Sequence, residues 1–191
     1  RELEDVFSRD LDLESLGLGP EDPITVLLVD VRAPNEGSLA ETAPDRLVLI
    51  LGEVFRAVSE AIEGQGGALH PRAGDTVIGV FALGSASASA RAALQGAEAV
   101  LQEGQQVLER WTESAAGPTL SAGLVSDPGA RDLPELIEKA SVLQRSAPPF
   151  SALADETTIQ AATRKDLLPT RQTVLDQTVY ELKAPSLEPP R

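Results

Sequence analysis

The sequence contains no cysteine, no methionine and a single histidine, His70. Without cysteine the chain can form no disulfide and no thiolate metal site, and one histidine rules out a histidine-rich zinc centre. A protein without disulfides is at home in a reducing compartment, so we expect a cytoplasmic location. Because the chain starts at Arg1 and lacks methionine, we also expect it to be a piece of a longer protein.

Long hydrophobic runs are absent as well. No apolar segment approaches the roughly 20 residues that a bilayer-spanning helix needs, and no signal peptide is visible. Aromatic residues make up only 3% of the chain, whereas hydrophobic residues make up 42%. The core must therefore be built from aliphatic side chains. The length of 191 residues suits one domain.

Positive charge is scarce, since 16 Lys and Arg stand against 30 Asp and Glu, and the net charge is −14. A surface this acidic repels nucleic-acid phosphates and anionic membranes, so we expect no nucleic-acid partner and no direct membrane contact. The simplest role of this charge is solubility. It still permits a nucleotide ligand whose phosphates are shielded by Mg²⁺.

Hydrophobic patterning predicts one domain over residues 24–183, between a lead-in helix or linker over 1–23 and a disordered tail over 184–191. Apolar runs predict strands at 24–31, 68–71, 76–81, 119–125, 148–154 and, as an edge strand, 174–182. Helical periodicity and capping residues predict helices from 44 to about 64, over 85–111, over 134–146 and from 155 onward. This order is typical of a ferredoxin-like α/β (α+β) sheet with helices on one face.

Two aspartates stand beside predicted strands. Asp30 closes the first apolar run, and Asp75 lies in the turn before the strand at 76–81. If these strands are neighbours, the two carboxylates approach each other and could hold Mg²⁺ or Mn²⁺ against a triphosphate. An aspartate in a tight turn is also commonplace, because its side chain bonds the local backbone. Asp30 has the stronger need of a partner, since a carboxylate that ends an apolar strand opposes its own tendency to stay exposed.

The residues around these aspartates resemble a known family. The segment ITVLLVDVR is similar to the opening strand of class III adenylate and guanylate cyclase catalytic domains, with Asp30 on the first metal aspartate. The segment GQGGALHPRAGDTVIGVF is similar to the glycine-rich hairpin of that family, with Gly74 and Asp75 on its Gly-Asp and Phe81 on its trailing Phe. SALADETTIQAA resembles a later segment of the family, and the similarity spans roughly residues 10–183.

The resemblance implies a nucleotide-cyclase sheet that is mostly antiparallel, with helices packed on its faces. It implies a metal site at Asp30, Val31 and Asp75 for Mg²⁺ or Mn²⁺, and nucleotide contacts at Arg72 and Gly74. ATP or GTP would be the nucleotide. Because the family forms its sites at a dimer interface, we expect a homodimer or a heterodimer with a complementary cyclase-like chain.

Several catalytic residues of the family are replaced. Pro71, which has no donor, stands at the lysine that contacts the purine. In IEKASVL, the segment most similar to V-N-x-A-x-R-L of the family, Glu138 stands at the asparagine and Val142 at the charge-stabilising arginine. An aliphatic side chain cannot replace the donors of a guanidinium. Sliding the alignment by three residues puts Arg145 at the arginine position, as a surrogate residue for the transition state.

We therefore predict a catalytically degenerate cyclase-like domain rather than an active enzyme. It would act in signalling as a dimerising regulatory module or as a nucleotide- and metal-binding module. The alternative is an active, divergent cyclase that makes cyclic nucleotide from ATP or GTP. A second alternative is a degenerate relative of the GGDEF-type diguanylate cyclases, because the glycine-rich hairpin also resembles their Gly-Gly-Asp-Glu-Phe motif.

Overall fold

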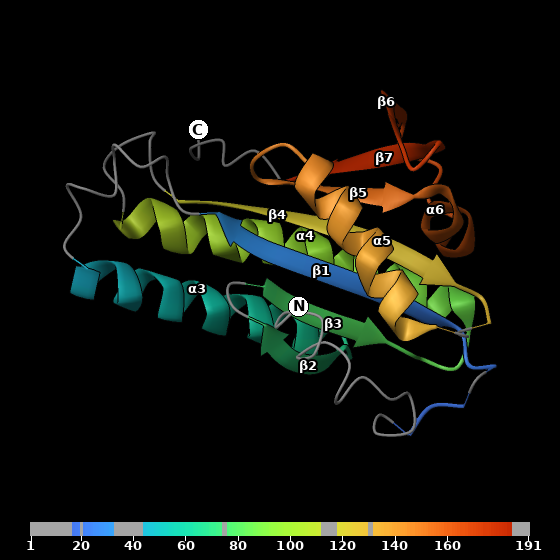
Figure 1. Cartoon of the computed structure of the whole chain (residues 1–191), viewed down its shortest axis with the longest axis horizontal. Coiled ribbons are helices and arrows are strands. Elements are labelled where there is room, and N and C mark those ends of the chain that lie inside the picture. The colour runs from blue at the N-terminus through green and yellow to red at the C-terminus, as the bar shows by residue number, and fades with distance from the viewer. Residues whose placement is uncertain are drawn as a thin grey trace, which may run out of the picture.

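The structure is a computed structural model that describes residues 17–19, 21–32, 44–73, 76–111, 118–129 and 132–184. Most of the predicted lead-in and the tail beyond Ala184 lie outside these ranges. The described residues form a seven-stranded sheet flanked by helices (Figure 1). None of the helices in these ranges combines the length and the hydropathy that crossing a bilayer requires.

Three apolar strands form the centre of the sheet. They are β1 (Ile24–Arg32), β3 (Thr76–Phe81) and β4 (Thr119–Asp127), and each is buried along most of its length. β1 pairs antiparallel with both β3 and β4, while β4 and β5 (Ser151–Asp155) pair in parallel. With β2 (Ala68–Ala73), β6 (Pro169–Val174) and β7 (Gln177–Lys183), the full strand order is β2-β3-β1-β4-β5-β7-β6. The expected sheet, mostly antiparallel and with the first and third strands as neighbours, is therefore confirmed.

Helices cover both faces of this sheet (Figure 1). Leu27 and Val29 pack into the core cluster of α3 (Pro44–Gly64), α4 (Ala86–Trp111) and α6 (Glu156–Ala162). Val26 and Leu28 pack into the core cluster of α5 (Leu133–Ser146), on the opposite face. The element order alone predicted helices on one face, which is wrong. Every residue of ITVLLV is apolar or β-branched, so both faces of β1 need cover.

The C-terminal segment also differs from its prediction. In place of a single edge strand, it forms a hairpin of β6 (Pro169–Val174) and β7 (Gln177–Lys183). The two turn residues, Leu175 and Asp176, have positive φ angles of 52° and 58°, as a tight hairpin turn requires. β7 pairs with β5, so β6 is the edge strand. β6 escaped prediction because its residues are polar and mostly exposed.

A glycine lets α5 lie directly on β4. A Cβ on Gly123 would collide with the carbonyl oxygen of Ala140 and would lie 2.7 Å from the backbone nitrogen of Gln144. Both contacts are backbone atoms, which cannot move aside unless the whole helix shifts. Gly123 therefore sets the depth at which the C-terminal half of α5 packs on the sheet. That half of α5 ends beside the end of β1, where Asp30 lies.

Candidate functional site

A row of polar residues crosses the sheet where β1 ends. The strand registers place five residues opposite one another on β3, β1, β4, β5 and β7: Thr76, Asp30, Ser121, Ser151 and Lys183. They share the face that α5 covers, because side chains alternate along each strand. The apolar core cluster on this face stops short of the row. The covered face of the sheet thus ends in a polar margin with one carboxylate near its centre.

The Asp30 carboxylate has one amide donor and one ion-pair partner close to it. Its Oδ2 accepts a hydrogen bond from Gln144 Nε2 at 3.1 Å and lies 3.8 Å from Arg32 Nε. Gln144 is buried, and its Nε2 also donates to Ser121 Oγ at 2.8 Å. The partners that a carboxylate at the end of an apolar strand needs are thus supplied by the protein itself. They are a guanidinium from the same strand and an amide from α5.

Arg32 ties the end of β1 to the last turn of α5. Its Nη2 donates to the carbonyl oxygens of Gln144 and Arg145, at 3.0 and 3.1 Å. Carbonyls in the last turn of a helix lack the i+4 N–H partners of the helix interior and carry partial negative charge, so a cation there is stabilising. Asp30 and Arg32 reach α5 together because residues two apart on a strand face the same way. These contacts join Asp30, Arg32 and the end of α5 into one cluster.

The predicted metal-site residues are only partly described. Asp30 lies in the polar row, whereas the side chain of its neighbour Val31 packs into the core cluster on the opposite face, and Val31 pairs with Leu120 of β4. Gly74 and Asp75 lie outside the described residues, and so does the side chain of Arg72. Thr76, which follows Asp75, pairs with Asp30 across β1 and β3. The approach of the two carboxylates therefore stays a prediction.

Asp30 supplies the ligand chemistry that Mg²⁺ and Mn²⁺ prefer, namely a carboxylate oxygen. Asp30, the backbone of Val31 and Asp75 are the residues that would hold such an ion. Within the described ranges, no group of three or more His, Asp or Glu side chains could hold a metal. The carboxylate is already faced by a cation of the chain itself, Arg32. The end of β1 thus offers the carboxylate oxygen that a divalent ion prefers. The positive charge of Arg32 beside this oxygen disfavours the ion.

α5 carries both positions considered for the arginine of the family. Val142 is half-buried against the core cluster, and Glu138 is exposed one turn earlier. Arg145 is exposed in the last turn, and its carbonyl accepts a hydrogen bond from Arg32. The other cation of this helix, Lys139, pairs with Glu135 at 2.6 Å. Arg145 is thus the α5 cation that the fold brings to the Asp30 end.

Sequence reasoning did not assign roles to Arg32, Gln144 or Ser121. For Arg32 a signal existed, because strand alternation places it on the same face as Asp30. For Gln144 no signal existed, because one glutamine among the polar residues of an amphipathic helix looks like a solvent-facing residue. It becomes part of the site only when Gly123 allows α5 to approach β4 closely.

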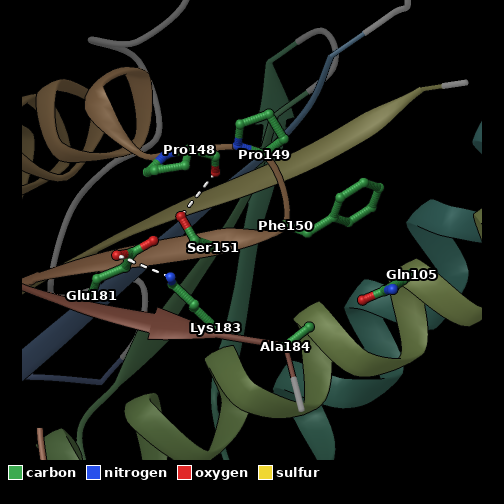
Figure 2. Close-up of a pocket in the computed structure, with 8 residues that line it drawn as sticks. All are labelled: Gln105, Pro148, Pro149, Phe150, Ser151, Glu181, Lys183 and Ala184. Atoms are coloured by element: carbon green, nitrogen blue, oxygen red, sulfur yellow. Dashed lines mark hydrogen bonds and ion pairs between the residues drawn. The ribbon is translucent and has the colours of Figure 1, made fainter. Parts of the chain in front are cut away.

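A pocket of about 290 Å³ lies at the same end of the sheet, beside the β7 end of the polar row (Figure 2). Eight residues line it: Gln105, Pro148, Pro149, Phe150, Ser151, Glu181, Lys183 and Ala184. Ser151 Oγ donates to the Pro148 carbonyl at 2.9 Å, and Lys183 Nζ lies 3.9 Å from Glu181 Oε2. Because its two charged residues face each other, the pocket presents little net charge to an anionic ligand.

No protein-family model and no curated protein matches the sequence. Solved structures do match the fold. The chain is similar to the adenylyl cyclase CyaB from P. aeruginosa, with a TM-score of 0.69 and 16% identity over 87% of this chain and 96% of that one. It is similar to the guanylate cyclase domain of RhGC from Catenaria anguillulae in complex with GTP, with a TM-score of 0.62 and 15% identity over 84% and 94% of the two chains.

A third structure is the non-canonical dimeric guanylyl cyclase domain of the RhoGC fusion protein from Blastocladiella emersonii. It matches with a TM-score of 0.62 and 15% identity over 84% of this chain and 96% of that one. At such identities the likeness establishes the fold alone. The chain therefore has the fold of class III adenylyl and guanylyl cyclase catalytic domains, as the sequence resemblance predicted.

Proposed function

We propose that the chain is a catalytically degenerate cyclase-like domain. It acts in signalling as a dimerising regulatory module and binds nucleotide with Mg²⁺ or Mn²⁺ at the Asp30 end. One observation carries this proposal. Arg32 and Gln144 already hold the carboxylate of Asp30, the residue that the sequence resemblance aligns with the first metal aspartate of the family.

The electrostatics of the reaction support the loss of turnover. Formation of a cyclic nucleotide joins the ribose 3′-hydroxyl to the α-phosphorus and releases pyrophosphate. This step needs positive charge around the triphosphate, and one missing donor typically costs about 10²–10³-fold in rate. The aligned arginine position is Val142, whose side chain packs on the core, and the aligned asparagine position is the carboxylate of Glu138. Pro71 stands at the purine-reading lysine. Together these replacements remove most of the expected rate.

Exposed aliphatic side chains support a role in dimerisation. Val48 and Leu49, which are adjacent on α3, are 69% and 60% exposed. Large apolar side chains that gather on a surface mark places that a partner covers. The fold relatives named above include a dimeric guanylyl cyclase domain and a guanylate cyclase domain in complex with GTP. We extend both properties, a partner of the same fold and a nucleotide ligand, to this chain.

Turnover is the direct test of degeneracy. The chain is incubated with ATP or GTP and either Mg²⁺ or Mn²⁺, and cyclic nucleotide is measured beside an Asp30→Asn control. We expect no product above that control. Turnover by the wild-type chain that Asp30→Asn abolishes would end the proposal of a degenerate domain.

Binding and assembly are tested separately. If ATP or GTP with Mn²⁺ binds the folded chain, the melting temperature rises, since a ligand at 100 times its Kd adds about 2.7 kcal/mol to stability. Light scattering over a range of protein concentrations reports the oligomeric state. We expect a dimer with a nucleotide-dependent melting temperature. A chain that stays monomeric at high concentration and shows no shift with either nucleotide contradicts the regulatory module.

An active, divergent cyclase is the second candidate, favoured by the position of Arg145 on the exposed last turn of α5 at the Asp30 end. In this case the wild-type chain makes cyclic nucleotide, and Arg145→Ala lowers the rate about 10²-fold or more. Arg171→Ala is the matched control, because Arg171 is an exposed arginine on β6. Equal rates for the two variants would remove Arg145 from the chemistry.

A further inference from the structure

The Asp30 carboxylate and the last turn of α5 share one cation. Arg32 Nε lies 3.8 Å from Asp30 Oδ2, while Nη2 of the same guanidinium donates to the carbonyls of Gln144 and Arg145. A guanidinium is planar and rigid, so it can satisfy both partners only when β1 and α5 keep their present spacing. The side chains of Asp30 and Arg32 are 20% and 36% exposed, so ions in solution can reach them.

A divalent cation at Asp30 would meet this arginine. Two positive charges a few ångströms apart at a partly exposed site repel each other, and the carboxylate cannot neutralise both. Binding of the ion therefore favours a state in which Arg32 has moved away from Asp30. Movement of the guanidinium also withdraws the donor from the two α5 carbonyls. Gln144 O would then keep its hydrogen bond from the Ala147 N–H, at 3.1 Å, without the added charge.

We propose that Arg32 is a built-in competitor of a divalent cation for Asp30, so that cation binding at the end of β1 loosens the last turn of α5. This inference rests on the proposed function, because that function places the ion at the Asp30 end. The coupling is reciprocal: whatever holds α5 against Arg32 weakens cation binding, and whatever frees α5 strengthens it. Arg145 is exposed on the last turn of α5 and moves with that turn.

The test is a Mn²⁺ titration of the full chain, followed by the electron paramagnetic resonance signal of free Mn²⁺. Arg32→Met removes the charge but keeps an apolar stem, and we expect it to bind Mn²⁺ about tenfold more tightly than the wild type, within the usual range of coupling. Arg32→Lys keeps the charge and should stay within about twofold to threefold of the wild type. The double variant Arg32→Met with Asp30→Asn should lose the gain.

Amide hydrogen exchange gives the second readout, on the last turn of α5. Mn²⁺ should speed exchange there in the wild type by about tenfold or more, the same coupling measured from the other side. In the Arg32→Met variant, amide exchange in the last turn of α5 should already be fast without Mn²⁺, and Mn²⁺ should not change it. Residues 136–140, earlier in the helix and packed on β4, serve as the internal reference and should not respond.

Three outcomes overturn the inference. The first is equal Mn²⁺ affinity in the wild type and Arg32→Met, and the second is a gain in Mn²⁺ affinity that persists when Asp30→Asn is added. The third is the absence of Mn²⁺ binding in every variant. Circular dichroism checks that each variant folds, and Arg32→Gln replaces Arg32→Met if the latter does not. The outcome is separable from the proposed function. Cyclic nucleotide production would refute degeneracy and leave the order of Mn²⁺ affinities intact, whereas equal affinities would refute the competitor and leave degeneracy intact.

Discussion

The two ends of β1 are each tied to β4 and to a helix, but by different chemistry. At the N-terminal end, Ser126 Oγ lies 2.7 Å from Thr25 Oγ1 and 2.9 Å from Thr158 Oγ1 of α6. Thr158 also bonds Asp155, the N-cap of α6. At the C-terminal end the corresponding links are the charged groups of Asp30 and Arg32 with the amide of Gln144.

Burial separates the two networks. Thr25 and Thr158 are both 0% exposed, whereas the side chains of Asp30 and Arg32 are 20% and 36% exposed. Hydroxyls can be buried cheaply once each has a partner, but charges retain access to water unless much desolvation energy is spent. The buried end, whose hydroxyls are closed to solvent, holds the fold together. The charged end can also exchange its partners with ions from solution, which suits it to binding and signalling.

The largest effect is expected where α5 is seated on the sheet. Gly123→Ala places a methyl group against the backbone of Ala140 and Gln144, so α5 must shift and the contacts at the charged end are lost. We expect a loss of about 3 kcal/mol in the free energy of unfolding, measured with urea. Gly52→Ala is the matched control, because a Cβ on this exposed residue of α3 meets nothing within 4 Å. It should stabilise the protein by about 0.5–1 kcal/mol. Similar values for the two variants would show that α5 can adjust.

A smaller effect is expected at the buried end. Thr158→Val keeps the shape of the side chain but leaves Ser126 and Asp155 without the hydroxyl they share. We expect a loss of about 2 kcal/mol, because unsatisfied buried polar groups keep their desolvation cost. Thr158→Ser retains the hydroxyl and should lose less than half as much. If the serine variant is as unstable as the valine variant, the methyl group and not the hydroxyl network stabilises this end.

The smallest effect is a pH dependence. Burial raises the pKa of Asp155 above its ordinary value of 3.8, although hydrogen bonds from Thr158 oppose the shift. Because the pKa is higher in the folded chain than in the unfolded one, the folded state takes up the proton first as the pH falls. Asp155 therefore favours folding increasingly as the pH drops through the raised pKa toward 3.8. In urea titrations, the free energy of unfolding of the wild type should rise relative to that of Asp155→Asn as the pH falls through this window. A constant difference would mean that the carboxylate is not effectively desolvated.

The two ends were not equally predictable. The family resemblance singled out Asp30. The apolar run that precedes Asp30 indicated that its carboxylate needs a partner. Thr25, Ser126 and Thr158 gave no warning, because hydroxyls in strands and helices are common and no spacing links these three. Gln144 was unpredictable for another reason, since it lies 114 residues from Asp30 along the chain. The exposed, polar β6 was missed because no face of it is apolar enough to produce a period of two.

By itself, the sequence determined the elements that bury apolar surface: the central strands, the long helices and the need for a partner at Asp30. These follow from local pattern, because a run of side chains can be apolar on one face, on both or on neither before any contact forms. Only the tertiary structure decided that α5 lies on the far face of the sheet and that its last turn shares Arg32 with Asp30. That outcome depends on how closely two backbones approach at Gly123, which is a property of the packed fold and of no single segment.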